Sequence, residues 1–176
     1  MYKIKKNKNQ YKMLNKEILN LLNEQIWLEN NASFYYLKLS IEFNEKGFKG
    51  ISTFFLTQSN EERDHMLKLI TYIMEKDISP ALPQYNFMEE STDNFGILLH
   101  FENSLLSEME VTNSVHKIIA KCKEVGDYTT ENFMQWFVEE QREEENKFKE
   151  IINDLKIIGE DGVGLYEINK SFLETN

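Results

Sequence analysis

The chain has 176 residues, of which 41% are hydrophobic and 12% aromatic, so it can bury the core of one globular domain and is not a disordered chain. Its formal net charge is −10, although residues 1–16 hold six lysines and no acidic residue. So acidic a body is expected to attract cations and to repel nucleic acid. We expect neither a membrane anchor nor a secretory signal, because no apolar stretch is long enough. The single Cys122 cannot form an internal disulfide, which favours a reducing cytoplasm.

Glycine and proline are scarce, with seven and two residues respectively, and this composition favours long helices. We expect residues 1–14 to be a flexible basic extension and residues 15–176 to form one domain. The first helix is predicted over residues 15–45 and the second over residues 48–76. Only a tight turn at Gly47 separates them, so the two helices are expected to form an antiparallel hairpin.

The segment DISPALPQYNFMEES, residues 77–91, holds both prolines and is predicted to be an extended crossover. A third helix over residues 92–125 and a fourth over residues 129–159 are expected to form a second hairpin, joined at the turn GDY. Residues 165–173 can form a short fifth helix. An all-α, four-helix bundle with one long crossover is the connectivity of the ferritin-like class.

One glutamate lies near the middle of the apolar stripe of each long helix, when the stripe is followed in steps of three and four residues. In antiparallel hairpins the midpoints of the helices meet, so these side chains are expected to converge. A single glutamate of this kind is better explained by a solvated face miscounted by one residue. Four at the same depth favour a cation site, because an isolated buried ion costs several kcal/mol. The four residues are Glu29, Glu62, Glu108 and Glu144, and the stripe of the third helix is Phe101, Leu105, Glu108, Thr112, Val115 and Ile119.

In the stretch NEERDHML, His65 follows Glu62 by three residues. This spacing places an imidazole beside a carboxylate on one helical face. Such a donor set suits iron, manganese or zinc. The fourth helix has Lys147 at the corresponding place after Glu144, so a second imidazole is missing. We therefore expect one metal position with a nitrogen donor and a second, more weakly binding one with oxygen donors alone. The first position comprises Glu29, Glu62 and His65, and the second comprises Glu108 and Glu144 with Glu62 shared.

From about Leu19 onward the sequence resembles ferritins of the haem-free bacterial type. The resemblance rests on LNEQIWLEN, NEERDHM, EMEVTNSV and FMQWFVEEQREEENKF in the four long helices, and on the tail GEDGVGLYEI. It implies a ferritin-like fold, a ferroxidase that oxidises Fe(II) with O2 or H2O2 at a di-iron centre, and a cage of twenty-four chains. The cage would store a ferric oxy-hydroxide mineral, and no haem is expected because Arg63 stands where bacterioferritins carry a haem-ligating methionine.

The resemblance also implies a role for individual residues. Tyr36 matches the tyrosine beside the di-iron centre, although an ordinary core tyrosine explains it as well. Three further acidic residues match a third iron site, and the alternative is that they are solvated charges. The resemblance implies the following ligands for the three irons. The first iron is bound by Glu29, Glu62 and His65, the second by Glu108 and Glu144 with Gln141 beside them, and the third by Glu61, Glu140 and Glu143.

Two other classes of protein are weighed against this one. A non-storage di-iron oxidoreductase, such as a rubrerythrin-like peroxide reductase, needs a second Glu-x-x-His motif, and a helical interaction module needs no inward glutamates. The remaining conspicuous side chains are given simpler roles. His100 and His116 are expected at a surface or interface, Trp27 and Trp136 are expected to pack, and Asp127 and Glu131 are candidates for lining an iron pore.

Overall fold

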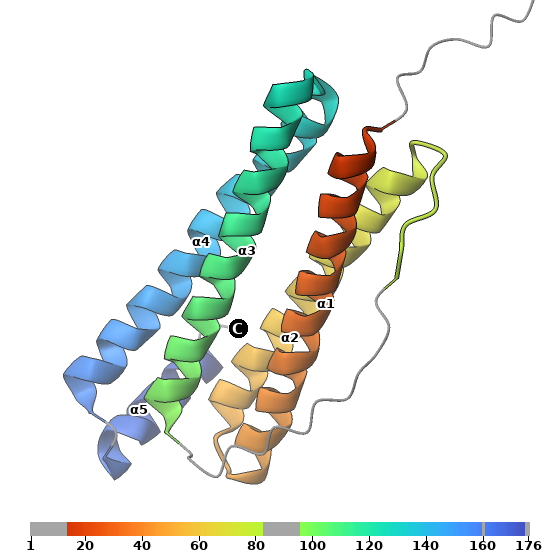
Figure 1. Ribbon diagram of the computed structural model, residues 1–176. Helices are drawn as coiled ribbons and strands as arrows, with labels where there is room; N and C mark the ends of the chain where they lie inside the picture. The colour runs from red at the N-terminus through yellow and green to blue at the C-terminus, as the bar shows by residue number, and fades with distance from the viewer. Residues whose placement is uncertain (1–13, 83–95, 160, 175–176) are drawn as a thin grey trace, which may run out of the picture.

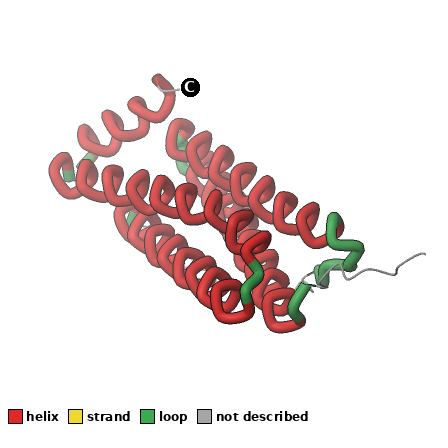
Figure 2. The backbone as a smooth tube through the Cα atoms, turned by 90° about the horizontal axis from the view of Figure 1, so that it is seen from above, coloured by secondary structure: helices red, strands yellow, loops and turns green. Residues whose placement is uncertain are grey.

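A computed structural model of the protein describes residues 14–82, 96–159 and 161–174, and this part of the chain is helical without strands. The four long helices form two antiparallel hairpins that lie side by side, and the fifth lies at one end of the bundle at an angle to the others (Figures 1 and 2). None of the helices described is both long and apolar enough to cross a bilayer. The helices are α1 (Lys16–Glu45), α2 (Lys49–Met74), α3 (Ile97–Val125), α4 (Tyr128–Ile158) and α5 (Gly162–Glu174).

The predicted bundle with a short fifth helix is confirmed, with small shifts at the helix ends. The helix α2 ends at Met74, two residues before the predicted end, and Asp77 just beyond it has a positive φ of 59°. The helix α5 begins at Gly162, three residues before the predicted start. The predicted start of the third helix, most of the crossover and nearly all of the basic extension lie outside the described residues.

The helix ends follow from local chemistry. The side chain of Asn15 accepts a hydrogen bond from the Glu17 N–H at 2.8 Å, and that of Asp127 accepts one from the Thr130 N–H at 3.2 Å. These side chains cap α1 and α4 by satisfying N–H groups that have no partner within the helix. The helix α3 stops at its C-terminal end at Gly126, whose φ of 69° is left-handed and favours glycine.

The core consists of two apolar clusters separated along the bundle. One cluster contains Tyr36, Phe55 and Phe101, and the other contains Leu69 and Phe137. Along each long helix the predicted glutamate falls between residues of the first cluster and residues of the second. A polar layer therefore crosses the middle of the bundle, with apolar packing on both sides.

Small hydroxyl residues set the level at which α1 meets α2. The Ser33 hydroxyl donates to the Ser59 carbonyl and the Ser59 hydroxyl donates to the Ser33 carbonyl, both at 2.8 Å. About two turns further on, the Ser52 hydroxyl donates to the Ser40 carbonyl at 2.8 Å. These cross-links bring the two backbones close and fix the register of the helices that carry Glu29, Glu62 and His65.

The helix α5 completes the N-terminus of α2, which has no side-chain cap of its own. The side-chain oxygen of Asn169 accepts hydrogen bonds from the N–H groups of Gly50 at 2.8 Å and Ile51 at 3.2 Å. A Cβ at Gly50 would lie 1.8 Å from the Asn169 carbonyl oxygen, so this close approach requires glycine. The Phe172 ring packs on Phe54 with centroids 4.9 Å apart, which holds α5 in place.

Candidate metal centre

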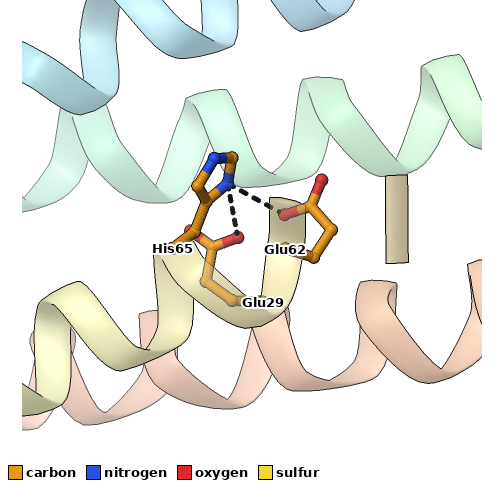
Figure 3. A group of neighbouring side chains, drawn as sticks. All are labelled: Glu29, Glu62 and His65. Carbon is orange, nitrogen blue, oxygen red and sulfur yellow. Dashed lines mark hydrogen bonds and ion pairs between the residues drawn. The ribbon is translucent and has the colours of Figure 1, made fainter. Parts of the chain in front are cut away.

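Three buried side chains from α1 and α2 point toward one another in the polar layer (Figure 3). The Nδ1 atom of His65 lies 3.1 Å from Oε2 of Glu62 and 3.9 Å from Oε2 of Glu29. Each residue offers one ligand atom, and these three atoms all lie within 4.8 Å of one another. Within the described parts of the chain this is the one such group of three, and its carboxylate and imidazole donors fit a divalent transition metal.

Two more buried carboxylates come from the second hairpin. Glu108 on α3 accepts hydrogen bonds from the Tyr36 hydroxyl and, at 3.1 Å, from Nε2 of Gln141. Glu144 on α4 accepts a hydrogen bond from Nζ of Lys147 at 2.7 Å. The structure thus supplies Glu108 and Glu144 to the same polar layer as the first three residues, but with no imidazole beside them.

Several oxygens in this layer have no hydrogen-bond partner among the described residues. Leaving a buried acceptor unsatisfied carries a desolvation cost, and the cost is larger when the group is charged. A cation placed between the oxygens would remove that cost, so the donor set fits metal ions. The unsatisfied oxygens are Oε1 of Gln25, Oε2 of Glu29, Oε1 of Gln58, Oε1 of Glu62, Oε1 of Gln141 and Oε2 of Glu144.

The crowding of acidic groups alters their protonation. Burial, followed by repulsion from Glu62, raises the pKa of Glu29 well above its ordinary range. Burial and the Glu108 charge do the same to the pKa of Glu62. Burial raises the pKa of Glu108 despite its hydrogen bonds, and it raises the pKa of Glu144 to about 7 although Lys147 opposes the change. Metal ions must therefore displace protons when they bind these carboxylates.

The three acidic residues assigned to a third metal are not gathered at one point. Glu61 accepts hydrogen bonds from Gln58 and, at 3.1 Å, from Nζ of Lys147. Glu140 has one oxygen 3.9 Å from Nε2 of His65. The side chain of Glu143 is 64% exposed and lies 3.4 Å from the Arg142 guanidinium. The third site stays a prediction, and two of its residues are paired with cationic side chains instead.

Tyr36 satisfies both of the roles considered for it. Its ring is fully buried and packs against Phe55 and Phe148, with centroids 5.8 and 5.9 Å apart. Its hydroxyl nevertheless reaches the Glu108 carboxylate, and burial raises the pKa of the phenol well above its ordinary value. Tyr36 is therefore a core residue whose polar end holds a carboxylate of the polar layer.

Sequence reasoning missed one residue of the layer and misplaced a histidine outside it. Gln25 is fully buried and donates from Nε2 to Oε1 of Glu29 at 2.8 Å. Its place one turn before Glu29 on the same helical face was the available signal. His100, expected at a surface or interface, is instead buried and meets the Phe43 ring edge-on at 5.6 Å. His116 is exposed as expected.

A groove of about 780 Å³ between α2 and α4 leads to His65. Asp64 and Glu61 supply acidic groups to its wall, and Trp136 packs edge-on against His65 with centroids 5.3 Å apart. Nζ of Lys68 lies 3.9 Å from the centre of the Trp136 ring. The wall of the groove thus carries both acidic side chains and the cationic Lys68.

The chain is similar in sequence to known ferritins. A bacterial non-heme ferritin of Campylobacter jejuni is 40% identical over 155 residues, covering 88% of this chain and 91% of that protein. A probable bacterial non-heme ferritin-like protein of Haemophilus influenzae is 36% identical over 159 residues, covering 90% of this chain and 94% of that protein.

The chain is also similar to solved structures of ferritins. The open-pore ferritin of the archaeon Archaeoglobus fulgidus superposes with a TM-score of 0.84 at 30% identity, covering 91% of this chain and 96% of that one. A humanized archaeal ferritin gives 0.85 at 29% identity, covering 90% and 95%. The family model described as a ferritin-like domain matches residues 19–158. With four long helices around a buried carboxylate and imidazole layer, the chain belongs to the ferritin family.

Proposed function

We propose that the protein stores iron and is a ferroxidase, oxidising Fe(II) to Fe(III) at a di-iron site inside each chain. The observation that carries this proposal is the meeting of Glu29, Glu62 and His65 within 4.8 Å, next to buried oxygens without hydrogen-bond partners. The names of its relatives, bacterial non-heme ferritins, support the same conclusion.

In this proposal Fe(II) is the substrate, and the side chains hold two ions for one oxidant. Glu29, Glu62 and His65 bind the first ion, and Glu108 and Glu144 bind the second with Glu62 shared between them. Two Fe(II) ions give one electron each to O2, which takes up two protons and leaves as H2O2, or to H2O2, which takes up two protons and leaves as two water molecules. Holding both ions close makes the two-electron step possible within one site. Gln25 and Tyr36 keep two of the carboxylates in position by hydrogen bonds.

The second position lacks a nitrogen donor, and we infer that its ion exchanges more readily. An oxygen-only set loses one strong borderline donor relative to the first position. A site that passes Fe(III) on to a mineral needs such an exchangeable position, whereas a permanent cofactor needs both ions retained. The additional acidic residues Glu61, Glu140 and Glu143 remain our candidates for a third iron on the way out.

We further propose that the chain assembles into a hollow cage of twenty-four copies that holds a ferric oxy-hydroxide mineral. Large apolar side chains on α1 support assembly, because Trp27, Phe34 and Ile41 recur every seven residues and each is about half exposed. A contiguous apolar stripe on the surface of a single chain is typical of a protein interface.

The deciding experiment is to measure iron bound per chain after repeated aerobic additions of Fe(II), with Glu29→Gln as the inactive variant. A store takes up far more than two ions per chain, whereas a rubrerythrin-like oxidoreductase keeps two and an interaction module keeps none. Uptake limited to two ions, or uptake unchanged in Glu29→Gln, would contradict the proposed function.

A further inference from the structure

A cationic side chain lies directly on the carboxylate assigned to the second metal position. Nζ of Lys147 is 2.7 Å from Oε1 of Glu144 and 3.1 Å from Oε2 of Glu61, so it links α4 to α2. The Glu144 side chain is only 2% exposed, whereas the Lys147 side chain is 35% exposed. The ammonium group therefore joins a buried carboxylate to one near the surface.

The ammonium and a metal ion would compete for the same carboxylate. Lys147 neutralises Glu144 through one oxygen, while the other oxygen has no hydrogen-bond partner among the residues described. A divalent ion bound to Glu144 would bring two positive charges next to a third, and like charges at this distance repel. The second metal can thus bind well only if Lys147 moves.

The chain offers Lys147 a second place to lie. A groove of about 420 Å³ between α2, α4 and α5 is lined by Lys147 itself and, further along α4, by Glu150 and Asp154. These two residues lie three and seven positions after Lys147, on the same face of the helix. The flexible four-carbon stem of a lysine can turn its head toward them without any change in the backbone.

We propose that Lys147 is a displaceable internal cation that controls occupancy of the second metal position. With the position empty it bridges Glu144 and Glu61, and when a divalent metal binds it swings into the groove beside Glu150 and Asp154. The exchange replaces one cation by another, and Lys147 keeps its proton throughout. This inference rests on the proposed function, because it takes Glu144 to be a metal ligand.

One consequence is that two carboxylates are released together. The same ammonium holds Glu144 and Glu61, so its departure frees a ligand for the second metal and, at the same moment, the carboxylate of Glu61. Filling of the second position would then free Glu61, one of the candidate ligands of a third iron. A histidine at position 147 could not couple the two events in this way, because it would stay bound to the metal.

The test is a calorimetric titration of the assembled metal-free protein with Zn(II), which does not change oxidation state. Lys147→Met keeps the length of the side chain and removes its charge, and Lys149→Met is the matched control. Lys149 lies on the same helix and pairs with Glu145 at 2.7 Å, away from the buried donors. We expect Lys147→Met to tighten the second binding step by about tenfold and to leave the first unchanged, since a charged hydrogen bond no longer has to break. Lys149→Met should titrate like the parent.

Crystals of the parent protein at low and at saturating Zn(II) provide an independent measurement. We expect Lys147 on Glu144 when only the Glu29, Glu62 and His65 position is filled, and in the groove when both are filled. A Lys147→Met titration identical to the parent, or a Lys147 that stays on Glu144 beside a bound second ion, would overturn the inference. Absence of Zn(II) at Glu29, Glu62 and His65 in every variant would instead contradict the proposed metal centre itself.

Discussion

Replacing Glu144 by glutamine should make the metal-free protein more stable at neutral and alkaline pH. Glu144 is almost fully buried, and its pKa is raised to about 7 from the ordinary 4.5 although Lys147 favours the charged form. A group whose folded-state pKa is raised keeps a proton in the folded state that the unfolded chain has already released. Its contribution to stability is therefore fully present below about pH 4.5 and is lost as the pH rises to about 7.

The size of the effect follows from that pKa. One pKa unit corresponds to about 1.4 kcal/mol, so a carboxyl group with a pKa of about 7 should lower the free energy of unfolding by on the order of 3 kcal/mol between pH 4.5 and pH 8. Glutamine resembles the protonated acid in shape and cannot ionise. The free energy of unfolding of the Glu144→Gln variant should thus not fall in this way as the pH rises. The substitution should also relieve repulsion on Glu62 and Glu108.

The assay is the guanidinium midpoint of the chelator-treated protein at pH 5 and at pH 8, at one protein concentration. Glu145→Gln is the control, because Lys149 and Thr112 hold the pKa of Glu145 below its ordinary value. That variant should lose stability at pH 8 relative to the parent, which is the opposite sign. If the advantage of Glu144→Gln over the parent is the same at both pH values, the buried carboxylate does not carry the cost that we assign to it.

Three further predictions address the metal centre and the assembly. Because the one imidazole donor is lost, the His65→Ala variant should slow the initial phase of Fe(II) oxidation by at least about tenfold in stopped-flow measurements. Its unfolding midpoint should change little, and an unchanged initial phase would show that His65 is not part of the site. Light scattering should show a large hollow particle at neutral pH, and a monomer or simple dimer would contradict storage. Lys147→His should tighten Zn(II) binding at the second position and slow transfer of iron to the mineral over repeated additions, and unchanged mineralisation despite tighter binding would show that the missing histidine does not set iron release.

Much of the fold could be predicted from the sequence, because long helices depend on local rules. Glycine at the turns, the proline-rich crossover and one inward glutamate per helix suffice to place the hairpins and the polar layer. Which residues of a helix face the core is harder to predict, since with 3.6 residues per turn an apolar stripe shifts gradually around the helix. On α3 the buried residues after Glu108 are Val111, Val115, Ile118 and Cys122, so Val115 lies in the predicted stripe but Val111 and Ile118 are buried where Thr112 and Ile119 were expected.

The side-chain contacts within the layer could not be predicted in the same way. The sequence indicates that Lys147 stands where a histidine is missing, but the pairing with Glu61 depends on the distance between α2 and α4. The burial of His100 likewise depends on how α1 and α3 pack, because Phe43 covers its ring. Helix spacing is set by the packing of many side chains at once, and no short motif encodes it.

The contact of Asn169 with the start of α2 has a consequence for the order in which the protein can mature. Asn169 is 119 residues beyond Gly50, and the hydrogen bonds that finish the N-terminus of α2 join these two distant places. During synthesis on the ribosome, α2 leaves the exit tunnel before Asn169 is made, so water is the partner of these two amide groups until nearly the whole chain has emerged. The helix that carries Glu62 and His65 is thus completed by α5, which is made later, so a nascent chain stalled before α5 presents the proposed metal ligands on a helix without this cap.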